Sequence, residues 1–278
     1  MGRRQEGFLQ AKDGLKLFWR CEVPDAPKAH LAVLPGYGEH SGRYRDFLGA
    51  MAGDGYAAHA LDFRGHGKSE GRRGHCRRFA DYLDDLEIFL RHLRARVAGG
   101  LLFVLGHSHG GLIAIHYLAK RRPDDWIGLV LSAPYLQLAF RPPRLKVYAA
   151  KVVGNILPWL PFKSEIGSEK LTRDPVARRA VDEDPLYNRT ATPGWFLEAN
   201  RAQSEVESIA PLLAVPTLLQ CGAADPIAAT SAARRFFELL GAQDKNYIEY
   251  PEMLHEPLNE LGKEQVWRDI SHWISNHS

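Results

Sequence analysis

The amino-acid sequence predicts an α/β fold with a mostly parallel central sheet and helices on both faces. Short apolar runs that suit buried strands alternate with longer stretches in which apolar residues recur at helical spacing. Leu101 to Leu105 is such an apolar run, and the stretch from Phe79 to Val97 has helical spacing. The alternation is interrupted once, by a proline-rich segment. We therefore expect an α/β domain that carries an inserted helical segment.

The first part of the chain follows this alternation closely. Asp13-Gly14 is a typical hairpin turn, and it would join strands at Phe8 to Leu9 and Leu15 to Arg20. The other elements expected before residue 134 are strands at 30–34, 57–61, 101–105 and 127–131 and helices at 45–53 and 79–97. Strands separated by helices are typical of a parallel sheet that is covered on both faces.

The segment from Pro134 to Arg201 contains no strand candidate. It holds many prolines, and we expect short helices broken by them. Its aromatic residues are expected to be exposed, and they are Tyr135, Phe140, Tyr148, Trp159, Phe162, Trp195 and Phe196. They could pack a small core of their own or form a cap over an apolar pocket. Strands at 217–220 and 246–250 and helices at 231–240 and 263–274 then resume the pattern. The predicted division is a core of residues 1–133 and 202–278 and a cap of residues 134–201.

Composition limits the classes of function. The 278 residues are 45% hydrophobic and 25% charged, with a net charge of +3, which is too small to indicate nucleic-acid binding. Cys21, Cys76 and Cys221 are widely spaced and odd in number, so we expect reduced thiols in a cytoplasmic protein. We find no secretory signal at the start and no apolar window long enough to span a membrane.

Gly106 to Gly110 reads G-H-S-H-G and matches the pattern G-x-S-x-G. An apolar run precedes it and a stretch with helical spacing follows it, as this motif requires. The two glycines allow a sharp turn from strand to helix, which would expose the hydroxyl of Ser108 at the tip. An ordinary strand-to-helix turn is the alternative interpretation of so short a pattern. The context favours Ser108 as a nucleophile.

A serine hydroxyl needs a base to take its proton and an acid residue to orient that base. In chains with this turn, the order is serine, then aspartate or glutamate, then histidine, each after a strand. Asp225 follows the strand expected at 217–220, and His255 follows the strand expected at 246–250. Each residue alone could be an ordinary turn or surface residue. Together they fit the required order, so we predict that they complete a catalytic triad with Ser108.

The predicted oxyanion hole consists of two backbone N–H groups. His109 directly follows the nucleophile at the start of a helix, and Tyr37 lies in the loop after the strand expected at 30–34. No histidine or cysteine spacing typical of a metal site is present, so we predict no metal. The basic cluster of Arg72, Arg73, Arg77 and Arg78 is interpreted as a solvated face, or as a weak attraction to anionic membrane surfaces.

Several stretches resemble the monoacylglycerol lipase and lysophospholipase branch of the α/β-hydrolases, which is also grouped with serine aminopeptidases. The matching stretches are G-Y-G-E-H-S-G-R-Y from Gly36, D-F-R-G-H-G-K-S-E-G from Asp62, G-H-S-H-G-G from Gly106, D-P-L from Asp184 and A-Q-D-K from Ala242. The resemblance covers nearly the whole chain and implies an α/β-hydrolase fold with an inserted helical cap. Its triad maps onto Ser108, Asp225 and His255. The chain departs from the family at Pro35, where histidine is usual, at His109, where methionine is usual, and at Leu258, where some members have a second histidine.

The resemblance implies a serine hydrolase that cleaves lipid esters, most of all monoacylglycerols, without a cofactor. In the family, the loop after the oxyanion residue lines the alcohol pocket, so Glu39 and Arg43 are expected to contact glycerol. Alternatively, these two residues form an ion pair that only shapes the loop. The expected partners are a small lipid ester and, through the cap, a transient membrane surface, with no nucleic acid. A lysophospholipase, a general carboxylesterase, a peptidase and a non-catalytic ligand-binding protein remain as alternatives.

Overall fold

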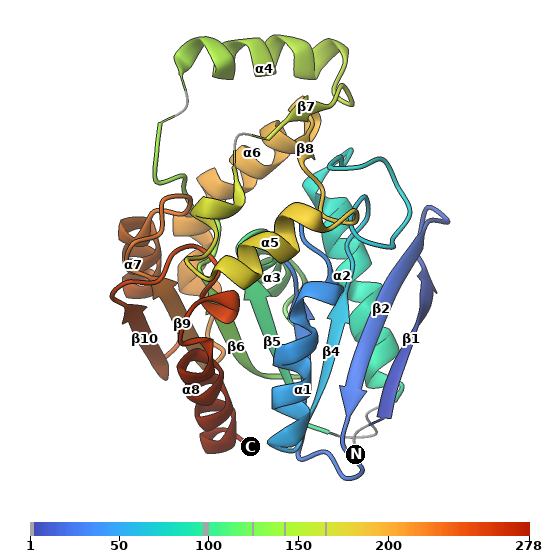
Figure 1. Ribbon diagram of the computed structural model, residues 1–278, viewed down its shortest axis with the longest axis vertical. Coiled ribbons are helices and arrows are strands. Elements are labelled where there is room, and N and C mark those ends of the chain that lie inside the picture. Colours follow the sequence, from blue (N-terminus) through green and yellow to red (C-terminus); the bar gives the residue numbers. More distant parts are fainter. Residues whose placement is uncertain (1–2, 97–99, 124, 142, 165) are drawn as a thin grey trace.

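The computed structural model describes residues 3–96, 100–123, 125–141, 143–164 and 166–278. A twisted sheet forms the centre, helices cover both of its faces, and a helical segment extends above the sheet (Figure 1). This arrangement confirms the predicted α/β class with a mostly parallel sheet.

The described residues form an eight-stranded sheet in the order β1-β2-β4-β3-β5-β6-β9-β10. Its strands are β1 (Arg3–Gln10), β2 (Lys16–Val23), β3 (Ala29–Leu34), β4 (Tyr56–Leu61), β5 (Leu102–His107), β6 (Trp126–Ser132), β9 (Thr217–Gly222) and β10 (Lys245–Tyr250). The hairpin strand β2 pairs antiparallel with β1 and with β4, and all other neighbours are parallel. The predicted hairpin and all six later strands are therefore confirmed, with ends that differ by a few residues. Parallel strands place their carboxyl ends at one edge of the sheet, where β3, β5, β9 and β10 lead into the loops of the site.

Helices cover the two faces of the sheet. They are α1 (Arg45–Gly53), α2 (Phe79–Arg94), α3 (His109–Arg121), α7 (Thr230–Leu239) and α8 (Lys263–Asn276). Successive residues of β5 point to opposite faces, so Val104 packs with α2 and α3 while Phe103 packs with α1 and α8. This two-sided burial explains why β5 is a continuous apolar run. The helix expected at 79–97 ends at Arg94 in the structure, and residue 97 lies outside the described residues.

The segment from 134 to 201 differs in part from the prediction. It contains α4 (Arg144–Ile156), α5 (Pro175–Glu183) and the start of α6 (Pro193–Ile209), which continues without a break past residue 201. Pro175 and Pro193 do not break helices but begin them, because the first turn needs no N–H from the proline.

Two expectations about this segment were wrong. No strand was expected there, but two strands of two residues each, β7 (Phe162–Lys163) and β8 (Thr190–Ala191), pair antiparallel. Strands this short leave no periodic signal in a sequence. Tyr135 and Trp195, which were expected to be exposed, are only 8% and 7% exposed, because they pack against the core below the cap. Phe140, Tyr148, Trp159 and Phe162 are exposed as expected.

The three cysteines are buried free thiols. Among the described residues, no cluster of His, Cys, Asp or Glu side chains is suited to hold a metal ion. Within the same part of the chain, no helix combines the length and the apolar character needed to cross a membrane.

Candidate active site

Ser108 lies on the sharp turn between β5 and α3. Its φ of 49° places a non-glycine residue in the left-handed region, which is strained backbone. The flanking glycines make the turn possible, because a Cβ on Gly110 would lie 2.1 Å from the carbonyl oxygen of Leu34 and one on Gly106 would lie 2.6 Å from the Cα of Gly111. Strand, turn and helix pack too closely here for any side chain. The G-x-S-x-G pattern thus reflects a steric requirement that presents the Ser108 hydroxyl at the carboxyl edge of the sheet.

The structure brings Ser108, His255 and Asp225 into one hydrogen-bonded row. His255 Nε2 lies 2.9 Å from Ser108 Oγ, and His255 Nδ1 lies 2.7 Å from Asp225 Oδ2. Asp225 follows β9, and His255 follows β10, so three separate strands deliver the three side chains to one edge. Both Ser108 and His255 are less than one tenth exposed. A hydroxyl, an imidazole and a carboxylate, the three groups that a serine hydrolase uses, are therefore linked in one row by hydrogen-bonding distances.

Asp225 is held by its own loop. Its Oδ1 accepts hydrogen bonds from the N–H groups of Ile227, at 2.7 Å, and Ala228, at 2.9 Å. These bonds leave Oδ2 free to face His255. The Asp-Pro sequence, which alone suggested an ordinary turn, here holds a carboxylate within hydrogen-bonding distance of the His255 imidazole.

The charges around His255 favour its protonated form. Burial lowers the pKa of this imidazole, but the neighbouring carboxylates of Asp225, Glu256 and Glu39 outweigh burial, so the pKa is raised above 6.5. A base with a raised pKa accepts a proton readily, which suits an imidazole that must take the proton of a serine hydroxyl.

Tyr37 and His109 lie beside Ser108 from two directions. Among the described residues, neither the N–H of Tyr37 nor that of His109 donates a hydrogen bond to another group. Pro35 has no N–H, and the N–H of Gly36 is already used, since it donates to Glu39 Oε2 at 2.7 Å. The first unused donor of this loop is therefore that of Tyr37, which lines the cavity at Ser108.

A family model described as "Serine aminopeptidase, S33" matches residues 25–262, which is most of the chain and includes every residue of this row. The chain belongs to this family. Its sequence is 35% identical to human monoglyceride lipase over 275 residues, covering 96% of this chain and 89% of that protein. It is 29% identical to monoacylglycerol lipase of Mycolicibacterium smegmatis over 277 residues, covering 99% and 98% of the two chains.

Solved structures support the same relationship. The crystal structure of Paleococcus ferrophilus monoacylglycerol lipase aligns with a TM-score of 0.84 and 30% sequence identity, and the alignment covers 100% of both chains. The chain is thus an α/β-hydrolase of the monoacylglycerol lipase branch of the S33 family, and an ester hydrolase fold surrounds the row of Ser108, His255 and Asp225. The three residues that the sequence resemblance assigned to the triad are the same three that meet in this fold.

Glu39 and Arg43, the residues expected to contact glycerol, lie in a buried network of hydrogen bonds. Glu39 Oε1 accepts from Arg43 Nε at 3.0 Å, and Glu39 Oε2 accepts from Tyr44 Oη at 2.7 Å. Burial raises the pKa of Glu39, but His107, Arg43 and these hydrogen bonds outweigh burial and hold it below its usual value. The other end of Arg43 donates to Glu256, the residue next to His255. Arg43 therefore bridges the loop after β3, which carries Tyr37 and Glu39, and the loop that carries His255.

Sequence reasoning missed three residues around the site. Glu256 is fully buried beside the catalytic row, Tyr187 lies under the guanidinium of Arg43, and Trp195 covers Tyr37. The acidic residue directly after His255 was a usable signal for Glu256. Tyr187 and Trp195 lie in the cap segment, and only the three-dimensional structure places them here.

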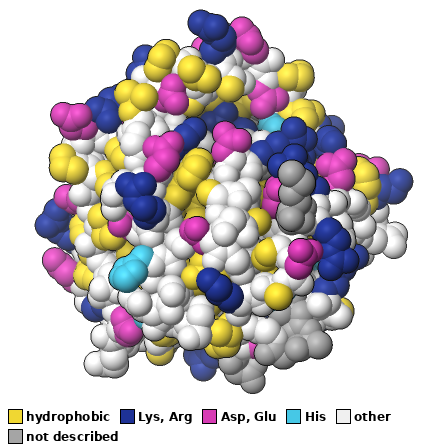
Figure 2. Space-filling view, turned by 60° about the horizontal axis from the view of Figure 1, so that its bottom comes forward, with side chains coloured by type: hydrophobic (Ala, Val, Ile, Leu, Met, Phe, Trp, Pro, Cys, Tyr) yellow, Lys and Arg dark blue, Asp and Glu magenta, His cyan; other side chains and the backbone are white. Residues whose placement is uncertain are grey.

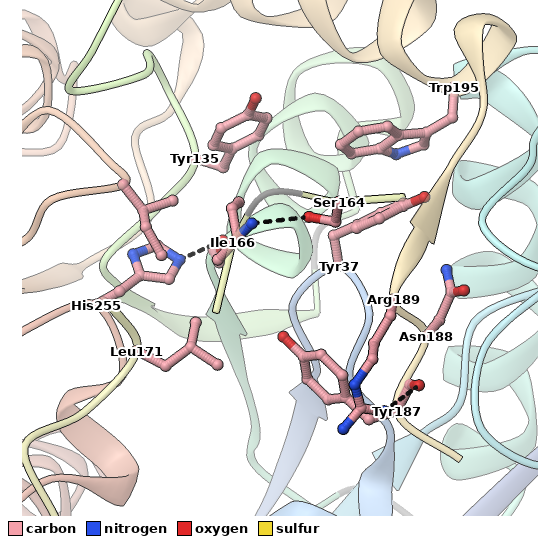
Figure 3. Close-up of a pocket in the computed structure, with 12 residues that line it drawn as sticks. Tyr37, Tyr135, Ser164, Ile166, Leu171, Tyr187, Asn188, Arg189, Trp195 and His255 are labelled. Carbon is pink, nitrogen blue, oxygen red and sulfur yellow. Dashed lines mark hydrogen bonds between the residues drawn. The ribbon is translucent and has the colours of Figure 1, made fainter. Parts of the chain in front are cut away.

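Two cavities adjoin each other beside the row, and Ser108 lines the smaller of them. A small one of about 70 Å³ is lined by Ser108, His255, Tyr187, Asn188 and Arg189, among others (Figure 3). A larger one of about 550 Å³ lies between α4 and α6 and is mostly apolar. Side chains shared by both cavities form the boundary, and these are Tyr37, Tyr135, Ser164, Ile166 and Trp195. The large apolar cavity is therefore the neighbour, across these shared side chains, of the small cavity that Ser108 lines.

The arginine cluster lies outside this row. Arg72 and Arg73 line a further hollow of about 480 Å³ together with Trp159, and this hollow shares Tyr187 and Asn188 with the small cavity. Arg78 forms an ion pair with Asp81. On the face shown in Figure 2, basic and acidic side chains are interspersed, with small apolar groups between them. Such a mixed surface is typical of a globular protein, and the interpretation of the arginines as a solvated face stays a prediction.

Proposed function

We propose that this protein hydrolyses monoacylglycerols to a fatty acid and glycerol through an acyl-enzyme on Ser108. The observation that carries the proposal is the row of Ser108, His255 and Asp225, whose serine and histidine line a small, partly polar cavity that adjoins a large apolar one. Relatives named monoglyceride or monoacylglycerol lipase match nearly the full chain, which supports the same substrate class. No cofactor is needed for this chemistry.

The steps follow from the geometry. His255 Nε2 accepts the proton of the Ser108 hydroxyl as Oγ attacks the ester carbonyl carbon. The N–H groups of Tyr37 and His109 donate to the oxygen that becomes negative. His255, now protonated and stabilised by Asp225, gives its proton to the glycerol oxygen as the ester C–O bond breaks. Water then takes the place of Ser108 as the attacking group. His255 takes a proton from the water as its oxygen attacks the acyl carbon. His255 returns this proton to Ser108 Oγ as the fatty acid leaves.

The acyl chain fits the larger cavity. Its walls are aliphatic and aromatic, including Leu138, Val153 and Phe196. Burial there contributes about 0.8 kcal/mol per methylene, which favours long chains without selecting the alcohol. The alcohol would then occupy the smaller cavity, where Asn188 and Arg189 supply polar groups.

The contact of Glu39 and Arg43 with glycerol stays a prediction. Their hydrogen bonds within the protein favour the alternative, in which the pair shapes the oxyanion loop. Because both charged groups are already bonded to protein partners, we propose a positioning role for them rather than direct recognition of glycerol.

The cap of residues 134–201 is proposed to admit substrate from a lipid surface. Exposed apolar side chains gather on α4 and the turn after it, and they are Tyr148, Val152, Ile156, Leu157, Trp159 and Leu160. An exposed apolar group next to an apolar cavity is suited to transient contact with micelles or membranes. The cytoplasmic location and the exact limits of the cap remain predictions.

A hydrolysis panel tests the proposed function. Purified protein is given mono-, di- and triacylglycerols of several chain lengths, lysophosphatidylcholine and an amino-acid amide, with Ser108→Ala as the blank. We expect the highest kcat/KM for monoacylglycerols. A higher value for the lysophospholipid or the amide would replace this function with lysophospholipase or peptidase activity. No turnover of any ester would support a non-catalytic binding protein.

A further inference from the structure

Trp195, near the start of α6 in the cap, contacts both residues whose N–H groups are proposed to form the oxyanion hole. Its ring stacks on Tyr37 with a centroid distance of 3.7 Å and an angle of 29° between the planes. Its Nε1 donates to His109 Nε2 at 3.4 Å. Figure 3 shows the stacked pair, with the Tyr37 ring directly alongside the indole. A single cap side chain therefore touches the side chains of both donors.

A second contact ties Tyr37 to the same part of the cap. Its Oη lies within hydrogen-bonding distance of two carbonyl oxygens, that of Thr190 at 2.8 Å and that of Gly74 at 3.0 Å. Thr192 Oγ1 also donates to Gly74 O, at 3.1 Å, and accepts from the N–H of Trp195 at 3.3 Å. The oxyanion loop and the chain leading into α6 are thus joined at several adjacent points.

The hydrogen bond to His109 requires a neutral imidazole with an unprotonated Nε2. Burial, with a smaller effect of His66, lowers the pKa of His109 to about 3, so the ring is neutral at physiological pH and Nε2 accepts from the indole. Phe79 and Tyr82 pack edge-on against the same imidazole. The ring is therefore confined by aromatic neighbours, and among the described residues its side-chain hydrogen bond is to the cap.

We propose that Trp195 is a positioning residue that holds the backbone donors of Tyr37 and His109 in place, so that the cap sets the geometry of the oxyanion hole. An oxyanion donor acts only if its N–H points at the developing charge, and misplacement by a fraction of an ångström weakens that effect. Fixing the two side chains restricts the backbone that carries both N–H groups. The proposal rests on the proposed ester hydrolysis but does not depend on the alcohol that is released.

A double-mutant cycle tests the hydrogen bond. Trp195→Phe keeps a ring for stacking and removes Nε1–H, and His109→Leu removes the acceptor while keeping the backbone N–H. Each change should lower kcat for a p-nitrophenyl ester about 5-fold, as expected for one neutral hydrogen bond. The double variant should also lose about 5-fold rather than about 25-fold, because both changes remove the same contact.

Trp126→Phe is the matched control. Trp126 is 6% exposed, like Trp195 at 7%, and also stacks on a tyrosine, Tyr117, but lies at the amino end of β6. This variant should keep kcat within 2-fold. Tyr37→Phe is an independent test. This variant keeps the ring that stacks on Trp195 but loses the hydrogen bonds of the hydroxyl to Thr190 and Gly74. It should lower kcat by a similar factor.

Inhibitor binding separates positioning from packing. An alkyl trifluoromethyl ketone forms an oxyanion on Ser108, whereas a free fatty acid only fills the apolar cavity. Affinity for the ketone should fall about 5-fold in step with kcat, while affinity for the fatty acid stays within 2-fold. Equal losses for both ligands, additive effects in the cycle, or unchanged kcat would overturn the proposal. A wild-type protein that reacts with the ketone but not with monoacylglycerols would refute the proposed substrate and leave this inference testable.

Discussion

The carboxyl edge of the sheet and the cap helix α4 differ sharply in solvent exposure. At the sheet edge, Ser108, His255 and Glu39 are nearly inaccessible to solvent, and each forms a defined hydrogen bond. On α4, Tyr148 and Ile156 are 66% and 68% exposed, and the helix lies at the far end of the molecule (Figure 1). In the first region, burial and hydrogen bonds hold the polar side chains in place. In the second region, apolar surface is in contact with water.

This contrast indicates a division of labour within one chain. Chemistry at an ester carbonyl needs donors and a base in fixed positions, and these come from loops anchored on buried strands. The exposed apolar surface of α4 would suit the contact with a lipid surface that we propose for the cap. The predictions below disturb one region at a time.

The largest effect is expected from the catalytic row. Ser108→Ala removes the nucleophile and should abolish measurable esterase activity in a folded protein. Asp225→Asn should lower kcat by about 10⁴-fold, because the imidazole loses its orienting carboxylate. Steady-state kinetics with a circular dichroism control for folding measure both changes. Activity near that of the wild type in either variant would remove Ser108 or Asp225 from the mechanism.

Substitution of Arg43 is expected to cause a smaller loss of activity, which affects all ester substrates. Arg43→Ala breaks the bridge between Glu39 and Glu256, leaves two buried carboxylates without a counter-charge, and should lower kcat/KM by about 10-fold or more. Since the bridge supports both loops, a monoacylglycerol and a p-nitrophenyl ester of the same acid should be affected alike. Arg45→Ala, at an exposed neighbouring position, is the control. A loss confined to the monoacylglycerol would instead establish glycerol recognition.

On the cap, the expected effect depends on how the substrate is presented. Ile156→Ser removes exposed apolar surface and should raise the apparent KM for monooleoylglycerol in vesicles by about 3- to 10-fold, while turnover of soluble p-nitrophenyl acetate stays unchanged. Leu212→Ser, which alters an apolar residue that is 54% exposed and lies outside the cap, should leave both values unchanged. Identical behaviour of the two variants on vesicles would argue against α4 as the lipid-contacting surface.

The smallest effect is a shift in the pH profile. His255 must be neutral to accept a proton, so kcat/KM should rise with pH through the pKa of His255, which lies above 6.5. Glu256→Gln removes one of the negative charges that raise this pKa, so the midpoint should move to lower pH. Glu252→Gln, an exposed position three residues before His255, should not move it. A midpoint that stays fixed or rises in Glu256→Gln would contradict the electrostatic role of Glu256.

The features that could be predicted from the sequence are those that depend on residues close together in the chain. The strands, the helices on the core and the turn at Ser108 each leave a local pattern, and the order of Asp225 and His255 follows from the loops that carry them. Contacts between distant segments leave no such pattern. The meeting of Trp195 with Tyr37 and His109 depends on how the cap folds back, and the two-residue strands β7 and β8 are too short to be periodic. Burial of Tyr135 was missed for the same reason.

The central claim is that Ser108 carries the acyl group of a monoacylglycerol. Labelling with a fluorophosphonate, followed by peptide mass spectrometry, tests it directly, with monooleoylglycerol added as a competitor in one arm. We expect one adduct, located on Ser108, that forms more slowly in the presence of the competitor and is absent from Ser108→Ala. An adduct on another residue, or labelling of Ser108 that monooleoylglycerol does not slow, would contradict the claim.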